Sequence, residues 1–112
     1  MVGLDFEEMR CMQQELHRKY HEKFGEGWKE LSPDIGRDKL LWMFVEAGEV
    51  ADIIKKQGDG EIMENSEVRC HFTEEMCDVL MYFNDVLICY GITPEEMARV
   101  YREKHERNLQ RW

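Results

Sequence analysis

The fold is decided by residues 38–57, which read DKLLWMFVEAGEVADIIKKQ. At 100° per residue, one face of a helix over this stretch is apolar, formed by Leu40, Met43, Phe44, Ala47, Ala51 and Ile54. More apolar residues lie on the other side, around Glu46 and Glu49, namely Trp42, Val45 and Ile53. A helix that is apolar nearly all round is predicted to be buried, and an acid inside it needs a cation or another partner.

A second helix, predicted over residues 73–90, shows the same pattern. Its apolar side carries Met76, Val79, Leu80, Phe83 and Leu87. A narrow polar stripe on the opposite side consists of Glu75, Asp78, Tyr82 and Asp85. No lysine or arginine occurs between residues 72 and 98, so the basic partners that usually lie four residues from an exposed helical acid are missing. The acids of this stripe are therefore predicted to face another helix.

The two helices each carry a pair of acids three residues apart. Glu46 and Glu49 share one helical face, and so do Glu75 and Asp78. If the faces meet, four carboxylates converge on an all-oxygen site of the kind that suits Mg²⁺, with Mn²⁺ as a substitute. The alternative is that these acids lie on solvated faces, which the lack of basic neighbours disfavours.

The rest of the chain also predicts helices. The first runs from a cap at Asp5 to Phe24, before the break at residues 25–27. The last begins with the capping box at residues 93–96 and reaches the end of the chain. The residues between Gly58 and the helix at 73–90 are predicted to be less regular. Residues 1–112 thus predict a single all-α domain of four helices, with no stretch that alternates as a strand would.

Composition excludes several functions. A net charge of −9 argues against nucleic-acid binding, which requires a basic surface. The absence of a long apolar run and of a signal-peptide pattern predicts no membrane association and a cytoplasmic location. The four cysteines have no zinc spacing, and Cys77 and Cys89 are interpreted as apolar core residues. No Glu-x-x-His pair occurs, which disfavours a di-iron bundle.

The acidic pairs also carry a resemblance. Glu-x-x-Glu at 46–49, a gap of 25 residues, and Glu-x-x-Asp at 75–78 resemble the MazG-like all-α nucleoside triphosphate pyrophosphohydrolases over roughly residues 36–108. The strings EAGEVA at 46–51 and EEMCDVLMY at 74–82 are most similar to the dCTP pyrophosphatase branch of that family. Lys104 and Asn108 fit the closing Lys-x-x-x-Asn of the same branch.

The resemblance implies a fold, a reaction and a set of contacts. The fold would be a four-helix MazG-like bundle completed by oligomerisation. The four acids would hold Mg²⁺ while water cleaves a (deoxy)nucleoside triphosphate, for instance dCTP or a modified dNTP, to the monophosphate and pyrophosphate. The implied substrate contacts are Tyr82 to sugar or phosphate, Lys104 and Asn108 to the phosphate chain, and Trp28 and His17 to the base. Lys56 stands where the family has a tryptophan, which leaves the preferred base open.

Other interpretations remain open at this point. Glu49 is the acid we expect to orient or deprotonate the attacking water. Asp85 either supports the metal site from behind the four acids or is an ordinary polar helix residue. Trp28 either packs in the core or stacks on the nucleobase. The rival functions are a phosphoribosyl-ATP pyrophosphohydrolase-like enzyme and a non-enzymatic acidic helical interaction module. The helices at 38–57 and 73–90 carry more apolar surface than one four-helix chain can bury. We therefore predict a homodimer or homotetramer.

Overall fold

A computed structural model describes residues 3–112, and this part of the chain is all-α, with no strand. Met1 and Val2, which begin the segment used for the prediction of location, lie outside the described residues. The elements in order are α1 (Phe6–Phe24), the 3-10 turn η1 (Gly25–Gly27), α2 (Pro33–Gln57), α3 (Asp59–Glu64), α4 (Ser66–Cys89) and α5 (Pro94–Leu109).

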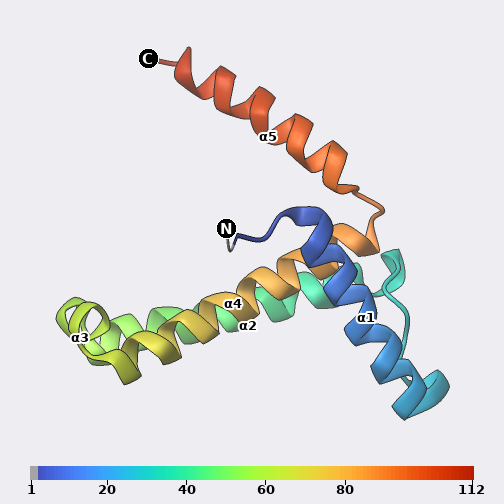
Figure 1. The fold of residues 1–112 in the computed structure, drawn as a ribbon, viewed down its shortest axis with the longest axis horizontal. Coiled ribbons are helices and arrows are strands. Elements are labelled where there is room, and N and C mark those ends of the chain that lie inside the picture. The colour runs from blue at the N-terminus through green and yellow to red at the C-terminus, as the bar shows by residue number, and fades with distance from the viewer. Residues whose placement is uncertain (1–2) are drawn as a thin grey trace.

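The long helices α2 and α4 lie side by side as an antiparallel pair, with the short α3 at its far end (Figure 1). Near the other end α1 packs against α4, and α5 leaves the pair and contacts only α1 among these helices. Between residues 3 and 112, no single helix is long and apolar enough to cross a membrane; α4 and α5 reach that length and composition only when joined across a 110° bend.

Side-chain caps fix the starts of the first and last helices where the sequence predicts them. Asp5 Oδ1 accepts a hydrogen bond from the Glu8 amide at 2.8 Å, and Thr93 Oγ1 accepts one from the Glu96 amide at 3.1 Å. Each bond satisfies an amide that has no partner inside the helix, an effect that contributes about 1 kcal/mol. The predicted boundaries of α1 and the predicted start of α5 are confirmed.

The two central helices begin earlier than the apolar patterns indicate. Helix α2 starts at Pro33 rather than residue 38, because proline fits the first position of a helix without losing a hydrogen bond. Helix α4 starts at Ser66 rather than residue 73, because Asn65 Oδ1 accepts from two first-turn amides. The segment predicted to be less regular contains α3, so that prediction was wrong.

The buried apolar residues are few and lie mainly between α2, α3 and α4: they are Ile35, Val50, Ile62 and Cys89. Gly36 allows the close approach of Tyr90, since a Cβ at this position would lie 2.5 Å from the tyrosine ring. Gly58, with φ of +84°, ends α2 in a conformation that favours glycine. Cys89 is a core residue as interpreted, but Cys77 is exposed, so its assignment to the core of one chain was wrong.

Helix α2 is not buried within one chain, contrary to the expectation from its composition. Its exposed apolar side chains include Leu40, Leu41, Trp42, Phe44, Val45 and Ile54. The accessible surface of 8812 Å² is about a third larger than the roughly 6,500 Å² of a typical monomer of this mass. The radius of gyration is 16.7 Å, whereas a compact domain of this length has about 13 Å. One chain therefore leaves much of its apolar surface uncovered.

Candidate metal and nucleotide site

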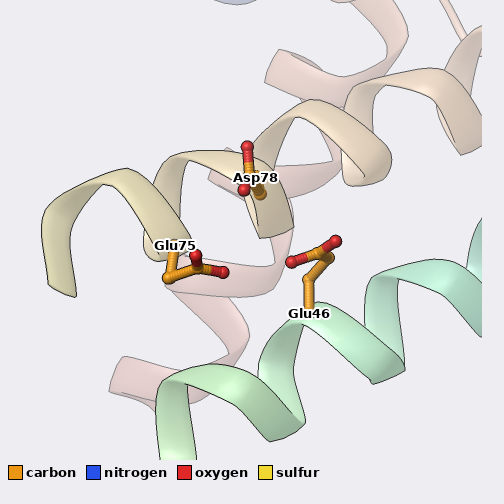
Figure 2. A group of neighbouring side chains, drawn as sticks. All are labelled: Glu46, Glu75 and Asp78. Carbon is orange, nitrogen blue, oxygen red and sulfur yellow. The ribbon is translucent and has the colours of Figure 1, made fainter. Parts of the chain in front are cut away.

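Three of the four predicted acids meet between the paired helices. Glu46 comes from α2, and Glu75 and Asp78 come from one face of α4, as their spacing requires (Figure 2). One oxygen from each of the three carboxylates lies within 4.8 Å of the other two. All three side chains are half-buried. The carboxyl groups of Glu46 and Glu75 point into the space between α2 and α4 (Figure 2).

Glu49 lies at the exposed edge of this acidic cluster (Glu46, Glu75 and Asp78). Burial, followed by repulsion from Glu49, raises the pKa of Glu46 from 4.5 to about 7. Contact with the Glu49 carboxyl, followed by burial, raises the pKa of Glu75. The predicted quartet is thus a group of three acids with the fourth close enough to perturb two of them. A positive charge placed among these acids would lower the pKa values of Glu46 and Glu75 again.

The donor set fits a hard divalent cation. Glu75 Oε2 is buried and has no hydrogen-bond donor within residues 3–112. A buried carboxylate oxygen without a donor is costly, and its neighbours here are acceptors as well. Mg²⁺ takes oxygen ligands at about 2.1 Å, so opposite ligands lie about 4.2 Å apart, close to the span of this cluster. The cluster therefore matches the size and chemistry of a Mg²⁺ or Mn²⁺ site.

A cavity of about 340 Å³ begins at Asp78 and extends between α1, α2 and α4. Three residues expected on resemblance to contact a nucleotide line it: Tyr82, Trp28 and His17. Tyr82 lies one turn after Asp78 on α4, and burial, followed by repulsion from Glu46, raises the pKa of its phenol. A larger cavity of about 520 Å³ lies against Trp28 too, but none of the acidic cluster lines it. The smaller cavity is therefore the one that connects acids and aromatic rings.

Aromatic side chains surround Trp28 at this cavity. Its ring lies 4.7 Å from the Tyr20 ring and 5.8 Å from the Phe24 ring, centroid to centroid, and the second pair is stacked. The indole N–H donates to His17 Nδ1 at 3.2 Å, and His21 Nδ1 lies 3.1 Å from the carbonyl oxygen of Trp28. Trp28 is half-buried, and two histidines one turn apart on α1 contact it, His17 at the indole N–H and His21 at the backbone carbonyl.

Lys39 is a lining residue that the sequence patterns did not single out. Its ammonium lies 5.6 Å from the centre of the Trp28 ring and 5.8 Å from that of Tyr82. Among residues 3–112 it has no carboxylate within 4.0 Å. Lys39 lies seven residues before Glu46, so both are on one face of α2. This signal was obscured because the apolar pattern predicts a helix that begins at residue 38, only one residue before Lys39.

Lys104 and Asn108 are not brought to the acids within one chain. Both are exposed on α5, which packs against α1 and does not contact α2 or α4. Figure 1 shows α5 directed away from the paired helices. The separation of Lys104 and Asn108 from the acids follows from the bend after α4, and no sequence pattern predicts this bend.

Comparison with protein-family models, with curated proteins and with solved structures gives no match to this chain.

Proposed function

We propose that this chain is a Mg²⁺-dependent nucleoside triphosphate pyrophosphohydrolase with a MazG-like all-α fold. The observation that carries the proposal is the buried, donor-free Glu75 Oε2 within a cluster of three acids that opens onto an aromatic cavity. The cluster suits a cation that binds phosphates, and about 340 Å³ is sufficient for a nucleobase and part of a sugar.

Each residue has a role in this proposal. Glu46, Glu75 and Asp78 hold the cation, which when bound supplies Lewis-acid stabilisation of negative charge on the phosphates. Glu49, exposed at the edge of the cluster, orients the attacking water and accepts its proton. As the water oxygen bonds to phosphorus, the anhydride P–O bond between the α and β phosphates breaks, and the nucleoside monophosphate and pyrophosphate leave.

The substrate contacts follow the cavity. Tyr82 lies next to the acids and contacts the sugar or phosphates, whereas Trp28 and His17 are at the end where the base is expected. Because α5 is remote from the acids of its own chain, Lys104 and Asn108 can act on phosphates only if α5 moves or if copies of the chain assemble.

A non-enzymatic interaction module is the rival that the exposed apolar surface favours. Such a module accounts for the exposure of Leu41 and Phe44, but it gives no reason for a buried carboxylate oxygen without a donor. Since assembly of identical chains explains the same apolar surface, we favour the enzyme.

The reaction is tested by incubating the chain with canonical and modified nucleoside triphosphates and Mg²⁺ or Mn²⁺. We expect at least one dNTP to give the monophosphate and pyrophosphate, with no turnover in EDTA. Chromatography of the nucleotide products distinguishes this from cleavage between the β and γ phosphates. Release of orthophosphate with a nucleoside diphosphate would contradict the proposal, and phosphoribosyl-ATP as the sole substrate would favour the related enzyme.

The same proposal includes a homodimer or homotetramer. An apolar surface of this extent on one chain is typical of subunits that bury it against a copy. Wild-type protein at micromolar concentration is expected to scatter light as two or four chains of 13.5 kDa. Phe44→Glu, on the exposed part of α2, should shift the mass toward that of the monomer, because it would bury an unpaired charge.

Met63→Glu serves as the matched control, because Met63 is an equally exposed apolar residue on the short α3. This variant should keep the wild-type mass. A fully active wild-type monomer would contradict the predicted assembly.

A further inference from the structure

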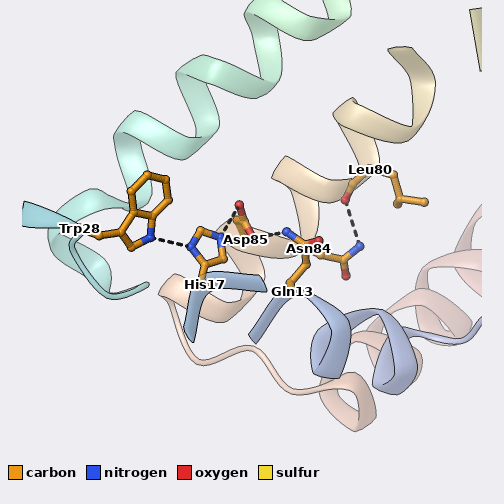
Figure 3. A network of polar contacts seen from close by, with 6 residues as sticks. All are labelled: Gln13, His17, Trp28, Leu80, Asn84 and Asp85. Carbon is orange, nitrogen blue, oxygen red and sulfur yellow. Dashed lines mark hydrogen bonds and ion pairs between the residues drawn. The ribbon is translucent and has the colours of Figure 1, made fainter. Parts of the chain in front are cut away.

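Asp85 is a buried carboxylate whose hydrogen-bond partners both come from another helix. It is 3% exposed on α4, about two turns beyond Asp78. Its Oδ1 accepts from Gln13 Nε2 at 2.7 Å, and its Oδ2 lies 3.2 Å from His17 Nε2 (Figure 3). Gln13 and His17 are four residues apart on one face of α1, so the Asp85 carboxylate orients both of these side chains.

The next link in the chain of bonds joins His17 to Trp28. Trp28 Nε1 lies 3.2 Å from His17 Nδ1, and an indole N–H can only donate. His17 Nδ1 is therefore the acceptor, and the single ring proton is on Nε2, where it is donated to Asp85. His17 therefore links Trp28 to Asp85 through its two ring nitrogens.

The same chain of bonds determines what Trp28 can offer a ligand. Its only hydrogen-bond donor is used by His17, and its carbonyl oxygen is held by His21. With that donor used, what the indole has left for the cavity beside Asp78 is its ring surface, which also faces the Lys39 ammonium at 5.6 Å. A planar base can stack on such a surface, whatever groups it carries on its edge.

We propose that Asp85 is a positioning residue for nucleobase binding, acting through His17 to hold the Trp28 ring as a stacking surface for the base of the triphosphate. The proposal rests on the proposed function. Asp85 has no contact with the acidic cluster in this assignment, so it affects substrate binding and leaves the cation site unchanged.

Asp85→Ala tests the first link. Without the Asp85 acceptor, His17 is free to adopt the other tautomer. Its Nδ1–H then faces the indole N–H of Trp28, and because two donors cannot bond to each other, the tryptophan ring is released. We expect KM to rise about tenfold, within the range that base–aromatic stacking contributes. The kcat value and the Mg²⁺ concentration needed for half-maximal activity should stay as in wild type, because only binding of the substrate is weakened.

Asp85→Asn is the matched variant. Its amide oxygen still accepts from His17, and its NH₂ group can donate to Gln13 once the glutamine amide turns round. KM should return close to the wild-type value. If the asparagine variant is impaired as strongly as the alanine variant, or if kcat falls instead, Asp85 acts by its charge and the proposal is overturned.

A purely structural role for Asp85 gives a different result. In that case Asp85→Ala lowers the melting temperature but leaves KM unchanged when assayed well below it. Should Asp85→Ala fail to fold, His17→Leu breaks the same chain of bonds at the next residue and is expected to raise KM to a similar extent. An unchanged KM in His17→Leu would also overturn the proposal.

Tryptophan fluorescence separates this proposal from the proposed reaction. Asp85→Ala should shift the emission to longer wavelength because the released Trp28 ring becomes more exposed to water, and the shift should be absent in the Trp28→Phe background. If no triphosphate is hydrolysed but the shift occurs, the reaction is wrong while the link from Asp85 to Trp28 stands. If hydrolysis occurs with no shift and no change in KM, the reaction stands and the link is wrong.

Discussion

Replacing Glu49 with glutamine is expected to lower the rate of pyrophosphate release by about 10²–10⁴-fold, the contribution of a well-placed general base. Glu49 is the exposed member beside three acids, so it can reach a water on the substrate side of the cluster. Glutamine keeps the size of the side chain and removes its ability to accept a proton. The measurement is the single-turnover rate with enzyme in excess over the dNTP and with saturating Mg²⁺.

The same substitution should leave the metal-free protein at least as stable as wild type. Glu49 raises the pKa values of Glu46 and Glu75, so its charge is repulsive in the folded chain. A residue in a buried ion pair behaves oppositely, and its loss costs about 3–5 kcal/mol. Glu74→Gln is the control, since it removes an exposed acid adjacent to Glu75 and should change neither rate nor stability. Full turnover in Glu49→Gln, or an unfolded variant, would contradict this assignment.

The sequence predicts the helices best where a local signal fixes their ends. Asp5 and Thr93 are capping residues next to acidic first turns, and both helices start there. The starts of α2 and α4 were missed because the apolar pattern begins a turn or two after the cap. The boundary signals are Pro33 and Asn65, which lie outside the apolar patterns at 38–57 and 73–90.

The acidic cluster could be predicted because it depends only on spacing within two helices that pair along their length. Glu46, Glu75 and Asp78 needed one assumption, that the two acidic faces meet, and they do. Asp85 could not be assigned in the same way, since its partners are on α1, about 70 residues earlier in the chain. The spacing of Gln13, His17 and His21 by four residues was the available signal for that face.

Glu46 is expected to make the stability of the metal-free protein depend on pH. Its pKa is raised from 4.5 to about 7 in the folded chain, so folding favours the protonated form. The stability that protonation provides is fully present below about pH 4.5 and is lost as the pH rises to about 7. The difference in melting temperature between wild type and Glu46→Gln, measured in EDTA, should therefore change across this interval and level off above it.

Mg²⁺ should restore the stability that ionisation removes. At pH 7.5, above the raised pKa of Glu46, the carboxylates repel one another and a cation that binds only the folded site raises the melting temperature. At pH 4, well below the raised pKa of Glu46, this acid is protonated, so the same addition of Mg²⁺ should have a smaller effect. Glu46→Gln should reduce the increase at pH 7.5, whereas Glu74→Gln should retain it. A wild-type melting temperature that Mg²⁺ does not change at either pH would mean that the cluster holds no cation, and the proposed reaction would lose its basis.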